Sequence, residues 1–309
     1  MKYYVKPIIQ KLLAKREHVA STLHNQYDSW WFNSPAKMQN SWIEQFCIHH
    51  SVPASQWISV FGERSNIKLS SEKRKVFFTP ENLSDRFREF GDHLLDQVDC
   101  AIGFENLNHP KYIRFPLWLM YFTQPNSENP GEDFRQRFSR TWSVDRPIFC
   151  SQIASHDERG NGKGLRTMCS STLDKIEPVF NEGRLLNNSS LLKNTYHNDP
   201  SFYLRDCRFN ICLENSAGSG YITEKIFRPL QTGAIPIYWG DSAPEPDVIN
   251  PGSYLLLDPK NPDDIYKEVR KLEKNARLRH SIINNPKITK QTSDWINNKH
   301  EMLVKLLKS

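Results

Sequence analysis

The sequence lacks any long, uninterrupted hydrophobic run. Only 38% of its 309 residues are hydrophobic, and no apolar segment approaches the roughly 20 residues that a membrane-spanning helix requires. Residues 1–7 contain no apolar core of the signal-peptide type. The sequence therefore predicts neither a membrane span nor a secretory route, and we expect a cytoplasmic location.

Cysteines are few and scattered. They form no CxxC pair and show no spacing to histidines that is typical of a metal site. This distribution argues against a zinc or redox centre and predicts reduced thiols. Three of the six cysteines lie in short apolar runs, where cysteine is most often a small buried hydrophobic residue. The six positions are Cys47, Cys100, Cys150, Cys169, Cys207 and Cys212.

The charge is only moderately unbalanced, since 41 Lys and Arg residues face 35 Asp and Glu residues. Basic residues cluster in 271–279 and 287–308, but acidic residues are interleaved and the apolar positions follow helical spacing. This pattern favours two amphipathic surface helices over a nucleic-acid groove. The basic excess also suits a nucleotide diphosphate. Peripheral contact of the last helix with an anionic inner membrane is the alternative use of these charges.

The most informative stretch is residues 209–240, in which two short apolar runs enclose a glycine-rich loop and a helical segment. Residues 209–213 and 234–238 predict buried strands. Between them, residues 216–220 form a loop of Ser, Ala and Gly, and Thr223 can cap the helix that follows. A helix that starts directly after such a loop points unpaired N–H groups at an anion. The stretch therefore predicts a phosphate-binding site.

Similar apolar runs alternate with helical or loop segments in both halves of the chain. Strands are predicted at 57–61, 76–78 and 100–104 in the first half, and near residues 148, 209, 234 and 254 in the second. This alternation predicts an α/β protein with a doubly wound parallel sheet in each half. Turn residues before the apolar run at 148 indicate a boundary near residue 147, which gives domains 1–147 and 148–309.

Individual residues of the central stretch form a longer pattern. Residues 214–215 are Glu-Asn, residues 221–225 are Tyr-Ile-Thr-Glu-Lys, and residues 238–240 are Tyr-Trp-Gly, with Gly233 and Pro236 before the last group. This string resembles the signature of the α-1,3-fucosyltransferases, especially the bacterial, GDP-fucose-dependent enzymes of the Lewis-antigen type. Residues 75–82, 101–104 and 112–117 are similar to further blocks of the family, so the resemblance covers about residues 57–260.

Two prolines depart from the family pattern. Pro80 stands where the family has a glycine before Glu81, and it can change how that glutamate is presented. Pro229 lies in the helix that follows Glu224, where we expect it to kink or shorten the helix.

The resemblance implies the GT-B fold, in which two Rossmann-like domains face each other across a cleft. It implies GDP-fucose in the C-terminal half and a sugar acceptor in the N-terminal half. The implied reaction is inverting transfer of L-fucose to the 3-hydroxyl of N-acetylglucosamine in N-acetyllactosamine-type glycans. Some members use the 4-hydroxyl or a glucose 3-hydroxyl instead. No acidic DxD-type pair lies near the donor loop, so we expect catalysis without a metal or other cofactor.

The resemblance also assigns the catalytic residues. Glu81, at the end of a predicted strand, matches the glutamate that takes the proton from the acceptor hydroxyl, although an exposed loop glutamate is the plain alternative. Lys225 and Arg166 are candidates to stabilise the charge that develops on the leaving diphosphate. Arg159, in the glycine-rich insert of residues 156–164, is a rival to Arg166. Glu224 would orient the fucose or stabilise the transition state, but the helix dipole also favours a glutamate there.

The remaining predictions concern ligand contacts. Asn215 and Tyr221 are expected to contact the nucleotide, whereas residues 238–239 are expected to pack in the core. Aromatic and histidine residues between positions 20 and 50 are candidates for the acceptor wall, or equally for core packing. They are Trp30, Trp31, Trp42, His49 and His50.

Two other function classes stay open. A GT-B enzyme that uses another nucleotide sugar would keep the lysine and the glycine loop. A non-catalytic glycan- or nucleotide-binding protein would bind GDP without consuming the sugar. A nucleic-acid-binding role has least support, because the basic residues are interleaved with acidic ones.

Overall fold

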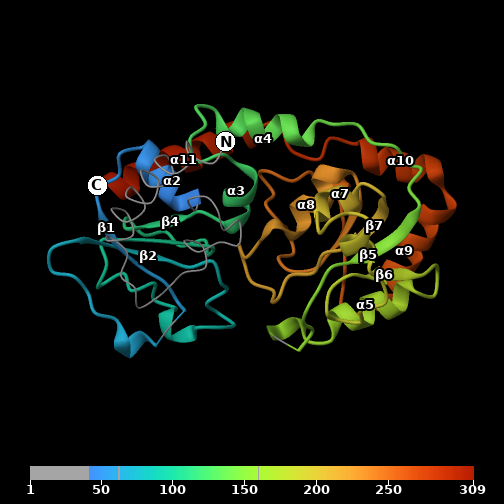
Figure 1. The fold of residues 1–309 in the computed structure, drawn as a ribbon, viewed down its shortest axis with the longest axis horizontal. Coiled ribbons are helices and arrows are strands. Elements are labelled where there is room, and N and C mark those ends of the chain that lie inside the picture. Colours follow the sequence, from blue (N-terminus) through green and yellow to red (C-terminus); the bar gives the residue numbers. More distant parts are fainter. Residues whose placement is uncertain (1–41, 62, 159) are drawn as a thin grey trace, which may run out of the picture. The chain divides into compact units, whose positions relative to one another are not determined.

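The computed structural model describes residues 42–61, 63–158 and 160–309 (Figure 1). These residues form two compact units, each built on a parallel sheet. Unit 1 contains the described residues up to Phe115, together with Phe122–Pro130 and Asn297–Ser309. Unit 2 contains Pro116–Tyr121 and Gly131–Ile296. The boundary predicted near residue 147 falls inside unit 2, directly before its first strand.

Unit 1 has a four-stranded sheet in the order β1-β2-β3-β4, with every neighbouring pair parallel. The three apolar runs predicted in this half overlap β1, β2 and β3, although β1 begins two residues earlier than predicted and ends at Ile58. Apart from Arg74 and Lys75 at the start of β2, the side chains of these strands are buried, as expected where both faces of a parallel sheet are covered. The pattern does not predict β4, which is only three residues long. The strands are β1 (Ser55–Ile58), β2 (Arg74–Phe78), β3 (Cys100–Gly103) and β4 (Tyr112–Arg114).

Unit 2 has a five-stranded parallel sheet in the order β6-β5-β7-β8-β9. All four strands predicted in this half are present, while the short edge strand β6 is an addition. From β5 the chain adds β6 at one edge, and it then adds β7, β8 and β9 on the other side of β5. Such a switch point between β5 and β7 leaves a crevice at the carboxyl ends of the two strands. The strands are β5 (Ile148–Gln152), β6 (Val179–Asn181), β7 (Cys207–Ile211), β8 (Ile235–Tyr238) and β9 (Leu255–Leu256).

Helices cover both faces of this second sheet (Figure 1). Helices α5 and α9 pack against each other, as do α7 and α8, and the two pairs lie on opposite sides of the strands. Right-handed crossovers in opposite directions from the switch point produce this arrangement. The helices that lie wholly within unit 2 are α5 (Leu165–Leu173), α6 (Leu191–Asn194), α7 (Pro200–Leu204), α8 (Glu224–Thr232), α9 (Pro262–Lys274) and α10 (Ala276–Asn284), with short 3₁₀ turns η3 (Gly160–Gly162) and η4 (Pro251–Ser253).

The remaining elements are short, apart from the last helix. Two short 3₁₀ turns belong to unit 1, η1 (Arg64–Asn66) and η2 (Arg88–Phe90). The other helices are α2 (Trp42–His49), α3 (Leu117–Phe122), α4 (Pro130–Phe138) and α11 (Thr292–Lys308).

Helix α8 carries the predicted donor residues at its first turn. Thr223 caps it, with its hydroxyl accepting a hydrogen bond from the Lys225 N–H. Pro229 lies inside the helix but does not shorten it, so that part of the expectation is wrong. The helix ends at Gly233, whose φ of 76° is the left-handed conformation that favours glycine. The Thr232 hydroxyl donates to the carbonyl of Arg228, which helps to hold the last turn after the proline.

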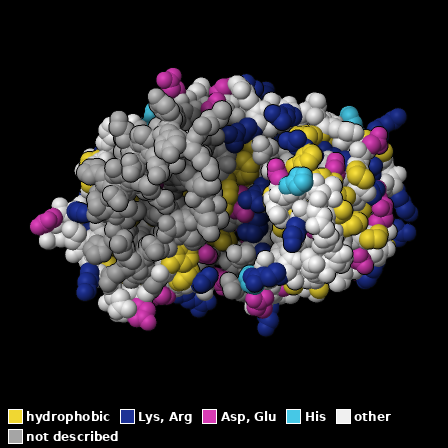
Figure 2. Space-filling view, viewed as in Figure 1, with side chains coloured by type: hydrophobic (Ala, Val, Ile, Leu, Met, Phe, Trp, Pro, Cys, Tyr) yellow, Lys and Arg dark blue, Asp and Glu magenta, His cyan; other side chains and the backbone are white. Residues whose placement is uncertain are grey.

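The amphipathic helices predicted near the C-terminus are present. Helix α9 buries Ile265, Val269 and Leu272, and α11 buries Leu303 and Leu307. Basic and acidic side chains are interspersed on the visible face of unit 2 (Figure 2). Among the described residues, no helix is both long and apolar enough to span a membrane.

The six cysteines are all free thiols. Five are buried, and burial raises the pKa of the Cys169 and Cys207 thiols to about 12. A thiol with so high a pKa is not ionised at neutral pH and is a poor nucleophile. The burial of five of the six thiols agrees with the predicted structural role.

Candidate functional site

A pocket that is open to solvent lies in unit 2 where β5 and β7 end. The wall is apolar on the side of Ile153, Pro200 and Leu204. Its charged lining residues are Arg166, Glu224, Lys225 and Arg228.

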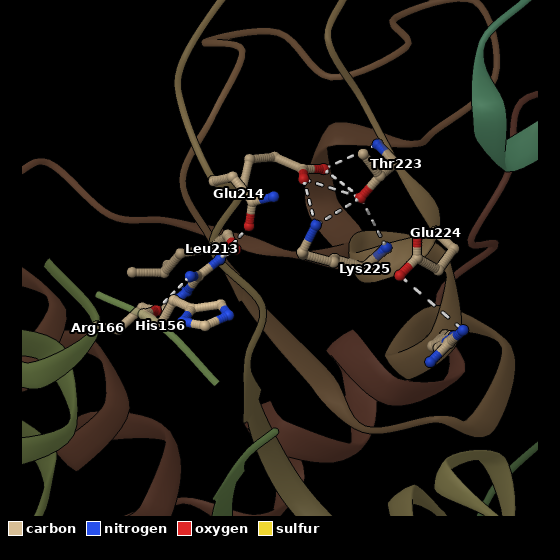
Figure 3. A network of polar contacts seen from close by, with 9 residues as sticks. His156, Arg166, Leu213, Glu214, Thr223, Glu224 and Lys225 are labelled. Atoms are coloured by element: carbon tan, nitrogen blue, oxygen red, sulfur yellow. Dashed lines mark hydrogen bonds and ion pairs between the residues drawn. The ribbon is translucent and has the colours of Figure 1, made fainter. Parts of the chain in front are cut away.

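A carboxylate holds the ammonium of Lys225 in place. Its Nζ lies 2.9 Å from Glu214 Oε2 and 3.1 Å from Thr223 Oγ1 (Figure 3). The Glu214 side chain is fully buried, whereas Lys225 keeps 26% of its side chain exposed. Part of the Lys225 side chain therefore stays accessible while its ammonium is paired with Glu214.

Glu214 also occupies the start of helix α8. Its carboxylate accepts hydrogen bonds from the Thr223 N–H at 2.8 Å and from the Thr223 hydroxyl at 2.8 and 3.0 Å. The sequence predicts a phosphate at this helix start, but the protein already places an anion beside it. A bound diphosphate is therefore expected over Lys225 rather than at the Thr223 N–H.

Two glutamates, Glu214 and Glu224, raise the pKa of Lys225 and so keep it charged. Burial alone would lower the pKa of Lys225, but the carboxylates of Glu214 and Glu224 raise it, and the net shift is upward. Lys225 is therefore a permanent cation over the physiological pH range.

Arg166, on α5, lies beside Asn215. Its guanidinium donates to Asn215 Oδ1 at 3.0 Å, to the Leu213 carbonyl at 2.9 Å and to the His156 carbonyl at 2.6 Å. Burial lowers the pKa of Arg166, while Glu214 acts in the opposite direction. An arginine stays protonated at neutral pH despite such a shift, so Arg166 supplies a second fixed cation.

Tyr221 and Glu224 complete the set of predicted donor residues. Tyr221 is buried, and its phenol group interacts electrostatically with Arg166, which raises the pKa of Arg166 against the effect of burial. Glu224 Oε1 lies 3.9 Å from the Arg228 guanidinium, which in turn stands over the ring of Tyr121. Burial, with Glu224 adding to it, raises the pKa of Tyr121 to about 12.

Glu81 belongs to unit 1, where it follows β2. Its backbone N–H donates to the Thr79 hydroxyl at 3.1 Å, and that hydroxyl donates to the Glu81 carbonyl at 3.2 Å. Asn82 is buried and accepts hydrogen bonds from Ser84, which forms a turn directly after Glu81. The glutamate thus stands on a defined loop at the carboxyl end of a strand, in a different unit from the donor residues.

The remaining sequence predictions divide into three groups. Tyr238 and Trp239 are buried, as predicted. Trp42 is half-buried, packs in unit 1 against Phe46 and donates to the Thr123 carbonyl, while His49 is exposed. Arg159, Trp30 and Trp31 lie outside the described residues.

Sequence reasoning missed several functional side chains. Glu214 belongs to the recognised string, and its place at a strand end before a lysine could have marked it as a partner. Arg228 could have been found from its spacing, since it lies one helical turn after Glu224. Nothing in the pattern marks Asn161, whose contacts lie 56 residues along the chain.

The chemistry available is that of an anion site. Three cations line the pocket, and only Glu224 adds a negative charge at its surface because Glu214 is paired with Lys225. Among the described residues, no group of three or more His, Cys, Asp or Glu side chains is arranged to hold a metal ion.

Two family models match most of the chain. The model for the C-terminal part of glycosyltransferase family 10 (fucosyltransferase) matches residues 149–288. The model for the N-terminal domain of the α-(1,3)-fucosyltransferase FucT matches residues 25–121. The pocket and its cations fall inside the first match, and Glu81 falls inside the second.

Individual proteins show the same similarity. The chain is 28% identical over 243 residues to the α-(1,3)-fucosyltransferase FucT of Helicobacter pylori, which covers 70% of this chain and 48% of that protein. It is 32% identical over 115 residues to GDP-fucose protein O-fucosyltransferase 3 of Xenopus laevis, which covers 34% of this chain and 24% of that protein. The chain thus spans less than half the length of each of these relatives.

Solved structures agree on the fold. A crystal structure of an α1,3-fucosyltransferase with GDP-fucose matches with a TM-score of 0.54 and 22% identity, over 81% of this chain and 78% of that one. The structure of TarM matches with a TM-score of 0.51 and 12% identity, over 88% of this chain and 59% of that one. At these identities the similarity shows the fold alone, which is the expected GT-B class.

Proposed function

The chain belongs to the α-1,3-fucosyltransferases of glycosyltransferase family 10, and on this premise we propose that it is an inverting fucosyltransferase that uses GDP-β-L-fucose. One observation carries the proposal. Three of the side chains assigned to the donor from the sequence, although up to 59 residues apart along the chain (166 to 225), line one pocket at the switch point of unit 2, namely Arg166, Glu224 and Lys225. Asn215 accepts a hydrogen bond from Arg166 at 3.0 Å, and Tyr221 is buried and interacts electrostatically with Arg166.

The donor diphosphate is proposed to bind Arg166 and Lys225. Negative charge grows on the β-phosphate as its bond to the sugar lengthens, so fixed cations there stabilise the transition state more than the ground state. Both cations are held in place before the donor arrives, Arg166 by two backbone carbonyls and Lys225 by Glu214. This leaves little reorganisation to perform during the reaction.

The proposed chemical step is a single displacement at the anomeric carbon. The acceptor oxygen forms a bond to that carbon, the bond to the β-phosphate oxygen breaks, and GDP leaves with the electron pair. Glu81 takes the acceptor proton as general base, and the configuration changes from β to α. Glu224, on the first turn of α8 beside the pocket, is proposed to face the fucose.

The acceptor is proposed to be the 3-hydroxyl of N-acetylglucosamine in an N-acetyllactosamine-type glycan. The name of the first relative above gives a linkage and that of the second gives a protein acceptor, but both names give fucosyl transfer, so similarity to them supports the donor more than the acceptor. The choice among the 3-hydroxyl, the 4-hydroxyl and a glucose hydroxyl stays with experiment.

Catalysis without a metal ion is also part of the proposal. Arg166 and Lys225 supply the positive charge that a metal supplies in other transferases. Loss of activity in excess EDTA, with recovery on adding manganese alone, would contradict it. The expected cytoplasmic location stays a prediction.

The decisive experiment measures GDP release from GDP-fucose with and without N-acetyllactosamine, in the wild type and in Glu81→Gln, with the product linkage determined by NMR. Acceptor-dependent release that collapses in Glu81→Gln, while GDP-fucose still binds, supports the proposed reaction and base. Release that survives the substitution moves the base elsewhere. Calorimetry with GDP-mannose and UDP-galactose separates other donors, and binding without turnover would indicate a non-catalytic protein.

A further inference from the structure

The insert between β5 and α5 reaches the glycine-rich donor loop through one side chain. Asn161 Nδ2 donates to the Ala217 carbonyl at 3.2 Å, and the Ala217 N–H donates to Asn161 Oδ1 at 2.7 Å. The amide of Asn161 thus satisfies both backbone groups of one loop residue, as a neighbouring strand would. Ala217 is two residues from Asn215, which bonds Arg166.

The insert is itself fixed at its base. The Asp157 carboxylate accepts the backbone N–H groups of Arg166 and Thr167 at 3.0 and 2.8 Å, which satisfies the first turn of α5. The carbonyl of Asp157 accepts the Gly164 N–H at 2.8 Å, and the His156 carbonyl holds the Arg166 guanidinium. The same segment therefore positions one cation of the pocket.

The middle of the insert lies on Trp239. A Cβ added at Gly162 would come within 2.4 Å of the Trp239 ring, so only a glycine lets the backbone lie this close. Trp239 is tied to the site in turn, because its carbonyl accepts the Glu214 N–H at 2.8 Å. The contact with Trp239 thus links the insert to Glu214, the residue that anchors Lys225.

The loop that the insert holds has little rigidity of its own. Residues 216–220 are Ser-Ala-Gly-Ser-Gly, and Gly220 has a φ of 78°. Glycines lose more conformational freedom on ordering than other residues, so a free loop of this composition orders at a cost to ligand affinity. A loop that is already ordered avoids that cost when the ligand binds.

We propose that residues 156–158 and 160–164 form a clasp that holds the donor loop in its binding conformation, and that Asn161 is the positioning residue that closes it. The ligand concerned is a nucleoside diphosphate, so the proposal rests on the donor site of the proposed function. Asn161 acts through the loop and takes no part in the chemical step. Its loss is therefore expected to weaken GDP binding and raise the KM for the donor, with kcat at saturating donor unchanged.

The test compares Asn161→Ala and Gly162→Ala with a matched control, Asn261→Ala. Asn261, directly before α9, is also an exposed asparagine. Its amide donates to the Asp258 carboxylate and not to the donor loop. Calorimetry with GDP and donor kinetics are measured for each variant. Amide hydrogen exchange is measured at Ala217 without ligand.

The expected result is a GDP Kd about tenfold higher in both clasp variants, with kcat within about twofold of the wild type, since Asn161→Ala removes two hydrogen bonds to the loop and Gly162→Ala displaces the insert from Trp239. Exchange at Ala217 is expected to accelerate in both, and Asn261→Ala to match the wild type. Unchanged GDP affinity in Asn161→Ala overturns the clasp, even if exchange accelerates. If the wild type binds no GDP, the proposed donor fails. The clasp is then judged by hydrogen exchange, and it fails as well if Asn161→Ala leaves exchange at Ala217 unaltered.

Discussion

The Lys225 ammonium lies 2.9 Å from the carboxylate of Glu214, and the Glu214 side chain is fully buried. The cation assigned to the leaving diphosphate is therefore one half of an ion pair before any donor arrives. Breaking such a pair leaves an uncompensated charge in a protein interior, which costs far more than an exposed pair is worth. Glu214 thus controls both where Lys225 lies and how strongly it keeps its proton.

Replacing Glu214 by Gln is expected to make donor binding sensitive to alkaline pH. Burial lowers the pKa of Lys225, and Glu214 is the strongest influence that raises it, so removing that carboxylate lowers the lysine pKa. The cation is then lost at a lower pH than in the wild type. The measurement is GDP affinity from pH 7 to pH 10. As the pH rises, the affinity of Glu214→Gln is expected to fall at a lower pH than the affinity of the wild type.

Thr223→Val is the control for this prediction. It removes the hydroxyl that bonds both Glu214 and Lys225 but keeps the carboxylate and its charge. Its alkaline profile should follow the wild type even if stability decreases by about 1 kcal/mol for the lost hydrogen bonds. Identical profiles in Glu214→Gln and the wild type would show that another group fixes the charge of Lys225.

Glu105, at the end of β3, is predicted to position the loop that carries Glu81. Its carboxylate lies 3.0 Å from His93 Nε2 and also accepts the backbone N–H of Leu83, two residues after Glu81. Burial opposes ionisation of Glu105, but these hydrogen bonds outweigh it and lower its pKa. Glu105→Ala is expected to reduce kcat at least tenfold while GDP affinity in unit 2 stays unchanged, because only the proposed base is displaced.

Glu105→Gln separates position from charge. Its amide oxygen can still accept the Leu83 N–H, so we expect it to recover most of the activity that Glu105→Ala loses. The measurement is donor and acceptor kinetics for both variants beside GDP calorimetry. Equal loss in the two variants, or a loss of GDP affinity, would argue against the positioning role.

The sequence predicts those parts of the site whose elements follow one another closely along the chain. Most of strand β7, all of β8, the loop and the cap of α8 fall within residues 209–240, and the chemistry of Lys225 follows from its place in that run. The GT-B class followed from the family resemblance, since the alternation of elements predicts only doubly wound sheets.

The parts that the sequence does not predict depend on distance along the chain. Asn161 meets Ala217 across 56 residues, and no periodicity connects them. The pairing of Lys225 with Glu214 needs the helix start to turn back over the strand end, which only the folded loop determines. Strand β6 is not predicted, because a three-residue edge strand is too short to show an alternating pattern.

Lys287 is expected to destabilise unit 2 at neutral pH, and Lys287→Met to stabilise it. Lys287 is 4% exposed, and burial, with the nearby Arg146 adding to it, lowers its pKa to about 8. Its ammonium donates to the Ile282 carbonyl at 2.6 Å, which offsets part of the cost of burying the charge. The net gain in Lys287→Met is expected to be about 1 kcal/mol at pH 7, because that hydrogen bond is lost as well.

The pH dependence gives this prediction its control. The folded pKa of about 8 lies below the ordinary 10.5, so the unfolded chain holds the extra proton between these values and wild-type stability rises as pH increases through that window. Urea unfolding at pH 7, 8.5 and 10 should show this rise in the wild type and not in Lys287→Met. An equal rise in both proteins would assign it to another group.

His300, on α11, is expected to make unit 1 sensitive to mild acid. It is buried beside Trp42 and Phe46, and its Nε2 lies 3.1 Å from the Thr123 hydroxyl. Burial, with His50 adding to it, lowers the pKa of His300 from 6.5 to about 4. The unfolded chain therefore takes up the proton first as the pH falls, and stability that is complete above pH 6.5 is lost progressively toward pH 4, by about 3 kcal/mol in total.

His300→Gln removes the titration while keeping a polar group near Thr123. Its stability at pH 7.5 is expected to be lower, because ring packing is lost, but it should decline less than the wild type between pH 6.5 and pH 4.5. Urea unfolding followed by tryptophan fluorescence measures this, since Trp42 packs edge-on to the histidine ring. His49→Gln, at an exposed histidine on α2, is the matched control and should keep the wild-type slope. If His300→Gln declines as steeply as His49→Gln, the acid sensitivity belongs to carboxylates and not to the buried imidazole.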